Sequence, residues 1–294
     1  MHSSASSLQR HKISSVVKKR RLMNQISCLL AWGATALVVM VIFSILLTLL
    51  WNGIRGLTLF TFTHITAAQG LPGGLLNAIM GSLIQVSLAT CLGTPLGILA
   101  GIFLSEFNRF PALSSAVRFV SDMLLSAPSI LIGLFVYLLL VASVGHFSGF
   151  AGACALAILI IPVIIRTTED SLHLVPSALR EAGAALGTAK WKTVLFICLP
   201  SAKTGILTGI LLGIARISGE TAPLLFTSLG NMDWSIDLAK PMASLPLVIY
   251  AYIDSADTAW IHLAWTAALL ITIGVLGLNI VARSFLSTPA QKQK

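Results

Sequence analysis

Charged residues are scarce in this sequence. Asp, Glu, Lys and Arg together make up 10% of the 294 residues, whereas 56% are hydrophobic and the mean hydropathy is +0.92. Soluble domains carry about 25% charged residues, so this composition excludes a soluble globular protein and indicates an integral membrane protein. The alternating pattern of membrane β-strands is also absent, which leaves transmembrane helices as the predicted structure.

The motifs of nucleotide-binding and metal-dependent proteins are missing as well. No G-x-x-x-x-G-K-[ST] sequence occurs, so the chain lacks this device for holding nucleotide phosphates. The four cysteines are scattered and the six histidines form no H-E-x-x-H or similar cluster, so neither a disulfide framework nor a metal site is expected. We therefore expect no metal, no cofactor and no covalent catalysis in this chain.

Long apolar runs are what the sequence has instead. A helix needs about 20 apolar residues to cross a bilayer. The first run is too long for the apolar part of a signal peptide, and no small-residue cleavage site follows it. The predicted fold is an all-α integral membrane protein with six transmembrane helices, at 27–50, 78–104, 121–143, 150–165, 205–228 and 262–285.

The basic residues are distributed unevenly between the predicted loops. With a cytoplasmic amino terminus, 16 of the 19 lysines and arginines lie on the cytoplasmic side, and four of the ten acidic residues lie in one outside loop. This is the positive-inside pattern, and it predicts that both termini are cytoplasmic. The basic run Lys18–Arg21 is interpreted as an orientation signal and a contact for anionic membrane lipid, and no role in binding nucleic acid is expected.

The predicted organisation is one membrane domain with two tails. Residues 1–26 form a basic, at most partly ordered cytoplasmic tail, and residues 27–76 hold the first transmembrane helix and an outside connector. Residues 77–286 form the transmembrane core, which includes a long cytoplasmic loop at 166–204, and residues 287–294 form the second cytoplasmic tail.

The long cytoplasmic loop contains the pattern of a short helix rich in small residues. Pro176 suits the first turn of a helix, and Gly187 suits the left-handed position just after its end. Between them, Leu179, Ala182 and Leu186 recur at helical spacing and form one apolar stripe. The small residues allow another protein to approach closely. The alternative is an amphipathic helix that lies on the membrane or on the protein itself.

This segment resembles the EAA loop of ABC-importer permeases, whose pattern is E-A-A, three residues, G, nine residues, I, one residue, L-P. Glu181–Gly187 match it, with Gly183 where the pattern has Ala, and Ile197, Leu199 and Pro200 follow at the same spacing. The resemblance implies a type I (MetI-like) permease core and an EAA coupling helix that docks on a separate ATPase subunit, which holds ATP and Mg²⁺. The docking residues that it implies are Arg180, Glu181, Ala182, Gly183, Leu186 and Gly187.

A charged pair is predicted inside the fifth transmembrane segment. Arg216 and Glu220 are spaced i,i+4, and a charge at the bilayer centre costs about 2.5–3.5 kcal/mol. On one helix, both lie within an arc of about 80° that also contains Gly205, Gly209 and Gly213. These glycines let another helix approach, so the pair is expected to face protein or a protein-lined path. A purely structural ion pair between packed helices is the alternative.

Two further features concern the shape and packing of the predicted helices. Pro223 removes one backbone hydrogen bond and is expected to kink the helix just after Glu220. The segment 78–104 carries a matching glycine ridge, which consists of Gly93, Gly97 and Gly101. Close helix packing is therefore expected in both segments.

Residues 215–227 and 166–169 resemble the permease subunits of phosphate ABC importers, and the resemblance covers most of the chain from the second predicted helix onward. It implies that Arg166, Arg216 and Glu220 lie on the phosphate path; without it, Arg166 reads as an arginine at a helix end that reaches toward the membrane surface. It also implies the bacterial cytoplasmic (inner) membrane as the location. The implied partners are a second homologous permease subunit, two ATPase subunits and an extracytoplasmic phosphate-binding protein.

The charged pair has a chemical rationale for this ligand. Arginine offers a planar fork of donors that matches phosphate oxygens. Phosphate keeps a P–OH proton near neutral pH because its second pKa is about 6 to 7, and an ionised Glu220 accepts from it. Sulfate has no such proton and meets only repulsion.

Three other functions remain to be compared with phosphate import. An importer of phosphonate, molybdate or sulfate would share the architecture, and the acid at Glu220 argues for a protonated ligand. A proton-coupled secondary transporter would be expected to have inverted repeats and more intramembrane acids. A membrane enzyme such as a lipid-phosphate transferase would need His, Asp or metal-ligand clusters, which the sequence lacks.

Overall fold

The computed structural model describes residues 3–107 and 110–286, and every named element in these ranges is a helix. The helical prediction is therefore confirmed for this part of the chain, and the expected tail at 287–294 lies outside it. The chain divides into two compact units, residues 1–51 and residues 52–294.

The first unit consists of most of helix α1, Ser3–Arg55, which contains the expected span 27–50 and continues on both sides of it. Its part Arg20–Arg55 is long and apolar enough to cross a membrane. The residues at 3–19, before that part, were expected to belong to an at most partly ordered tail. They are helical instead, and no proline or glycine interrupts them.

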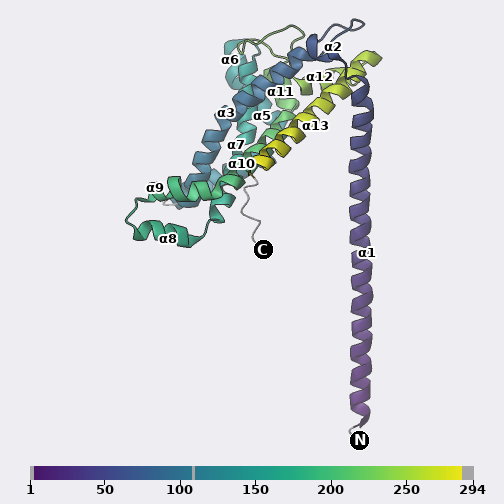
Figure 1. The fold of residues 1–294 in the computed structure, drawn as a ribbon, viewed down its shortest axis with the longest axis vertical. Helices are drawn as coiled ribbons and strands as arrows, with labels where there is room; N and C mark the ends of the chain where they lie inside the picture. Colours follow the sequence, from purple (N-terminus) through teal and green to yellow (C-terminus); the bar gives the residue numbers. More distant parts are fainter. Residues whose placement is uncertain (1–2, 108–109, 287–294) are drawn as a thin grey trace. The chain divides into compact units, whose positions relative to one another are not determined.

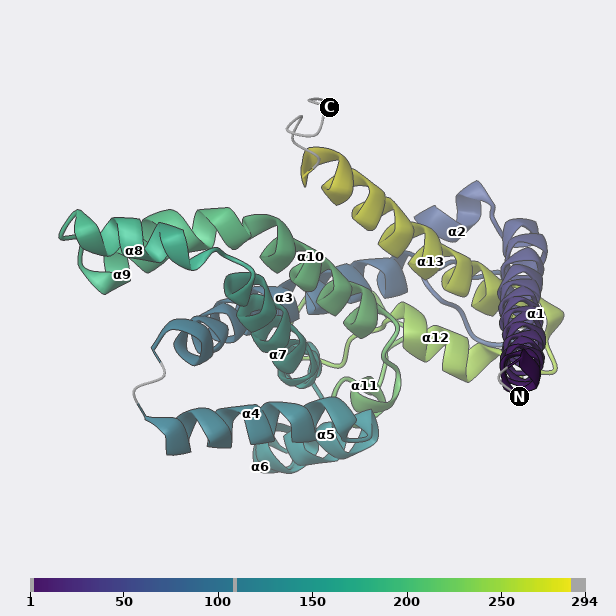
Figure 2. The same ribbon diagram turned by 90° about the horizontal axis from the view of Figure 1, so that it is seen from below.

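Four long helices form the frame of the second unit, and shorter helices cap its two ends. In Figure 1, α8 and α9 lie at one end of this unit and α2, α6 and α12 lie at the other, and Figure 2 again shows α8 beside α9. The long helices are α3 (Leu76–Glu106), α7 (Gly149–His173), α10 (Leu199–Ser218) and α13 (Thr258–Leu286). The short helices at the two ends are α2 (Leu59–Thr63), α6 (Ala142–Val144), α8 (Ser177–Ala185), α9 (Lys190–Thr193) and α12 (Leu245–Tyr252).

The cytoplasmic loop expected at 166–204 is shorter than predicted. Helix α7 continues through His173, beyond the expected end of the fourth span at residue 165. The next span begins at Lys190, because α9 runs into α10 through the π-helical segment η2, Val194–Cys198. The residues between these helices carry α8 and its two connections.

Helix α7 is the centre of the second unit. In the most apolar stretch of α7, 67% of the residues are buried. The corresponding share is 22% in α3 and 33% in the Lys190–Ser218 span. The glycine ridge of α3 packs on Ile160, Ile164 and Thr168 of α7, and the ridge of α10 packs on Ile160, Thr167 and Ser171. In a bilayer, where lipid tails are as apolar as leucine, such close packing holds helices together. The predicted role of both ridges is confirmed.

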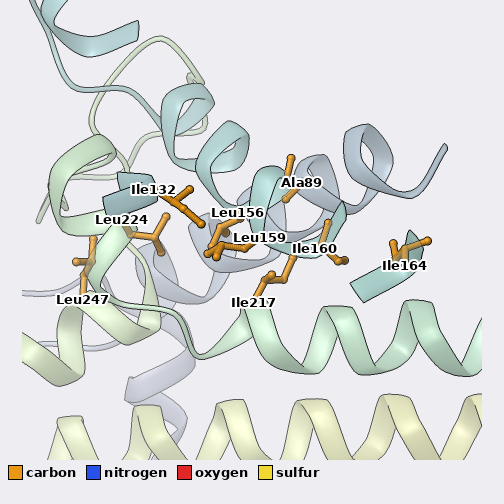
Figure 3. Packing of buried hydrophobic residues seen from close by; sticks show 10 residues of the cluster. Ala89, Ile132, Leu156, Leu159, Ile160, Ile164, Ile217, Leu224 and Leu247 are labelled. Atoms are coloured by element: carbon orange, nitrogen blue, oxygen red, sulfur yellow. The ribbon is translucent and has the colours of Figure 1, made fainter. Parts of the chain in front are cut away.

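A cluster of buried apolar side chains fills the space between these three helices. Figure 3 shows Ala89 of α3, Leu156 and Ile160 of α7 and Ile217 of α10 in this cluster. All four side chains are at most 1% exposed. The cluster places the carboxyl end of α10 directly against the central helix.

The third expected span, 121–143, is broken. Helices α4 (Pro111–Ser126) and α5 (Ser129–Val136) meet at an angle of 107°. Pro128 has no backbone N–H and disfavours helical backbone at Ala127, which is extended. After α5 the chain continues through the π-helical segment η1, Tyr137–Val141. Among the described residues, five helices are long and apolar enough to span a membrane, or six if this bent pair forms one span.

Candidate functional site

Arg216 and Glu220 lie at a second break in a membrane helix. Helix α10 ends at Ser218 and α11, Ala222–Thr227, begins three residues after Gly219. The prediction that Glu220 continues the same helix is therefore wrong, and so is its calculated place on the glycine face. The helix is interrupted where only a kink was predicted. Gly219 favours helix ends, and Pro223 lies in the first turn of α11, where its missing N–H is tolerated.

The break still brings the two predicted side chains together. Arg216 Nε is 3.9 Å from Glu220 Oε1, and the side chains are 34% and 19% exposed. This separation is an ion pair and is longer than a hydrogen bond. A loosely held guanidinium beside a carboxylate can donate to an oxyanion and accept from a protonated ligand at neighbouring positions.

Helix α11 is fixed from two sides, which sets the position of Glu220. A Cβ on Gly133 of α5 would lie 2.6 Å from Pro223 Cα, so the two short helices approach at backbone distance. At the other end of α11, Gln85 Nε2 of α3 donates to Ser228 Oγ at 3.0 Å, and Ser228 donates to the carbonyl of Met242 at 2.7 Å. Gln85 and Ser228 are fully buried.

Arg166 pairs with a different carboxylate from Arg216. It lies on α7, and its Nε is 3.6 Å from Asp170 Oδ2, with side chains that are 57% and 62% exposed. The ion pairs found in the described residues thus place Arg166 with Asp170 and Arg216 with Glu220. The partner Asp170 is at i,i+4 spacing, which is the signal in the sequence that could have identified it.

The predicted docking helix is present as α8. Pro176 is the residue before its first turn, one position earlier than predicted. Gly187 has φ +70°, in the left-handed region, as predicted. The N–H of Thr188 donates to the carbonyl of Gly183 and the N–H of Gly187 donates to that of Ala184. These two bonds form the Schellman motif that ends many helices.

The predicted docking residues divide between two faces of α8. Glu181, Ala182, Leu186 and Gly187 are exposed, and Leu186 retains 84% of its accessible surface. Leu179, also on the predicted stripe, is 39% exposed. This face is free in the isolated chain to receive another protein.

Arg180 and Gly183 face the protein instead. The Arg180 guanidinium donates to Glu106 Oε1 at 2.6 Å, and this hydrogen bond raises the pKa of Arg180 above its ordinary value. A Cβ on Gly183 would lie 2.9 Å from Thr193 Cγ2 and Oγ1, so glycine lets α8 approach α9. Both residues thus make contacts within the chain, and their assignment as contacts to an ATPase stays a prediction.

Two buried carboxylates near this end were not assigned a partner from the sequence. Glu106, the last residue of α3, pairs with Arg180, and Glu169 of α7 pairs with Arg118 of α4 at 2.7 Å. Their side chains are 5% and 6% exposed. The described residues contain no group of three or more His, Cys, Asp or Glu side chains arranged to hold a metal ion.

The comparisons with known proteins agree with this architecture. Residues 93–288 match the family described as binding-protein-dependent transport system inner membrane component. The phosphate transport system permease protein PstA of Pasteurella multocida is 52% identical over 266 residues, which cover 90% of this chain and 95% of that protein. PstA of Xylella fastidiosa (strain 9a5c) is 47% identical over 270 residues, which cover 92% and 94%. The chain belongs to this family, among its PstA permeases.

Solved structures support the same fold for this chain. An inward-facing MetNI methionine ABC transporter chain superposes with a TM-score of 0.60, at 19% identity, over 72% of this chain and 94% of that one. This likeness confirms the predicted MetI-like core. With its apolar helices and its family, the chain is an integral membrane protein.

Proposed function

We propose that this chain is the permease subunit of an ATP-driven importer that carries inorganic phosphate across the cytoplasmic membrane. The observation that carries the proposal is the similarity to phosphate transport system permeases, 47% to 52% identical over at least 90% of the chain. The Arg216–Glu220 pair supports it, because it offers a donor fork and an acceptor within one site. Arg166 adds a second guanidinium, whose side chain is 57% exposed.

The chain would act within a larger complex. A second homologous permease completes the path, two ATPase subunits hold ATP and Mg²⁺, and an extracytoplasmic phosphate-binding protein delivers the ligand. The exposed apolar face of α8 supports an ATPase as the partner at that end. The distribution of basic residues supports cytoplasmic termini and a contact between Lys18–Arg21 and anionic lipid.

Transport in this scheme is a change of access and involves no covalent step in this chain. Nucleotide binding moves the ATPase subunits, α8 moves with them, and the helices joined to α8 change the side on which the path opens. Arg216 and Glu220 hold the ligand by charge and by proton position, so that the pair selects the oxyanion while the ATPase supplies the energy.

The proposal is tested by purifying the tagged chain with its associated subunits from native membranes and reconstituting the complex in proteoliposomes with the binding protein. Uptake of radiolabelled phosphate is measured with ATP, with a non-hydrolysable analogue and with excess unlabelled sulfate. We expect uptake only with ATP and no competition by sulfate. Uptake without nucleotide contradicts the importer, and equal uptake of sulfate contradicts the assignment of phosphate.

A further inference from the structure

Arg180 of α8 forms several hydrogen bonds with residues outside that helix. Its Nη2 donates to Glu106 Oε1 at 2.6 Å, and its Nε is 3.1 Å and 3.3 Å from the two oxygens of the same carboxylate. Glu106 is the last residue of α3 and is 5% exposed. The helix that carries the exposed docking face is therefore tied to the end of a long transmembrane helix.

The same guanidinium also holds the end of the central helix. Arg180 Nη2 donates to the carbonyl of Leu172 at 2.8 Å, and Nη1 donates to that of Val175 at 2.7 Å. Leu172 lies in the last turn of α7, where backbone carbonyls lack partners within the helix. One planar fork of donors thus joins α3, α7 and α8.

A second contact connects α8 to the next span. Gly183 packs against Thr193, which ends α9, and against Ile197 in η2. The inward face of α8 is thus connected to α3 and α7 through Arg180 and to the Lys190–Ser218 span through Gly183. Only the outward face is left for a partner.

Burial makes the connection through Arg180 hard to break. A carboxylate as deeply buried as that of Glu106 is strongly disfavoured without its counter-charge. When α8 is displaced, the favourable response is for Glu106 and the ends of α3 and α7 to move with Arg180. A connection of this kind transmits a displacement instead of absorbing it.

We propose that Arg180 and Glu106 are positioning residues that couple the movement of α8 to α3 and α7 during transport. The inference depends on the proposed function, in which α8 is the helix that the ATPase moves. It assigns Arg180 a role inside the permease, and it assigns the surface contact to the exposed residues of the same helix.

The test is the substitution Glu106→Gln in the full reconstituted complex. Phosphate uptake and ATP hydrolysis are measured in the same vesicles, and their ratio is the readout. We expect hydrolysis to persist while phosphate taken up per ATP falls about tenfold, as for a mutation within a coupling network. A ratio equal to that of the wild type overturns the proposal. So does loss of the ATPase from the purified complex, since that result assigns the pair to docking.

Glu169→Gln is the matched control. It removes an equally buried carboxylate from Arg118, at 6% exposure, in a pair that joins α4 to α7 and does not involve α8. If the pairs were merely structural, both variants would lower thermal stability and neither would change uptake per ATP. Coupling through Arg180 predicts that the ratio falls in Glu106→Gln alone.

Two further measurements make every result informative. If Glu106→Gln fails to assemble, Glu106→Asp, which keeps the charge but shortens the reach to Arg180, decides the question. A ratio below that of the wild type supports coupling, and an unchanged ratio overturns it. If the wild-type complex itself shows no ATP-driven phosphate uptake, the proposed function has failed, which is distinct from a failure of the coupling inference.

Discussion

Each of four arginines in the second unit pairs with a carboxylate, and burial separates their roles. The carboxylates that face Arg118 and Arg180 are 6% and 5% exposed, whereas the one facing Arg166 is 62% exposed. Removing one partner of a buried pair costs about 3–5 kcal/mol, while an exposed pair contributes about 0–1 kcal/mol. Glu220, at 19% exposure, lies between these limits, which suits a carboxylate that exchanges its partner for a ligand.

Glu220→Gln is expected to weaken the preference for phosphate over sulfate. The amide oxygen still accepts from a P–OH group, but without the negative charge, and the new N–H₂ group donates to sulfate. Because a hydrogen bond to a charged group contributes about 1.5–3 kcal/mol, the preference should fall about tenfold or more. The measurement is competition of sulfate with radiolabelled phosphate in the reconstituted complex. Asp237→Asn, in the loop at 228–244, is the control that should leave the preference unchanged; an unchanged preference in Glu220→Gln would remove the role assigned to it.

Local spacing predicted the Arg216–Glu220 pair but not the partner of Arg180. Positions four apart in sequence come together in a helix and, here, also across a helix break. Glu106 and Arg180 are 74 positions apart, and no pattern along the chain reports a contact at that distance. Arg180 therefore resembled a surface residue of the docking helix until the fold placed a buried carboxylate beside it.

At the scale of the element, breaks in helices were the hardest feature to predict. Hydrophobic runs define the extent of a span. The run at 121–143 is apolar on both sides of Pro128, and in 205–228 the apolar residues resume after Glu220, so neither run marks where its helix is interrupted. The helix α8 was predictable because its end depends on Gly187, whose left-handed conformation is a local property. The extension of α7 to His173 was not, since most of its last residues are polar and only some of them, such as Thr168 and Glu169, are buried by neighbouring helices.

Gly183→Ala is expected to separate α8 from α9. The added Cβ would lie 2.9 Å from Thr193 Cγ2 and Oγ1, and overpacking of this kind costs about 1–3 kcal/mol. Thr193→Ala removes both atoms, so the double variant should recover most of the lost stability. A double-mutant cycle on the thermal unfolding midpoint of the purified chain measures this recovery.

Gly187→Ala is the control for this cycle. The added Cβ would have no other atom within 4 Å, but residue 187 has φ +70°. The substitution therefore destabilises the chain through its backbone conformation. Thr193→Ala should not restore the stability that Gly187→Ala loses. If Thr193→Ala relieved both variants equally, or neither, the contact between Gly183 and Thr193 would not be what positions α8.

At the scale of the whole molecule, composition alone determined the class of protein. Six predicted spans correspond to five long helices and one bent pair in the described residues. The packing of those helices around α7 was harder to predict from the sequence. The ridges on α3 and α10 indicate that each packs on a helix but do not identify that helix. A membrane helix with small residues can pack against any partner with a suitable groove.

The orientation of the molecule is tested by cysteine labelling. The positive-inside pattern predicts that α8 is cytoplasmic and that the loop at 228–244 is outside. In a chain whose four cysteines are replaced by alanine, Leu186→Cys and Ile236→Cys add reporters at sites that are 84% and 62% exposed. A membrane-impermeant maleimide added to spheroplasts should label Ile236→Cys alone, and inverted vesicles should give the opposite result. Both sites must react after detergent treatment, so that protection reports the side of the membrane. The reverse labelling would place α8 away from any cytoplasmic ATPase.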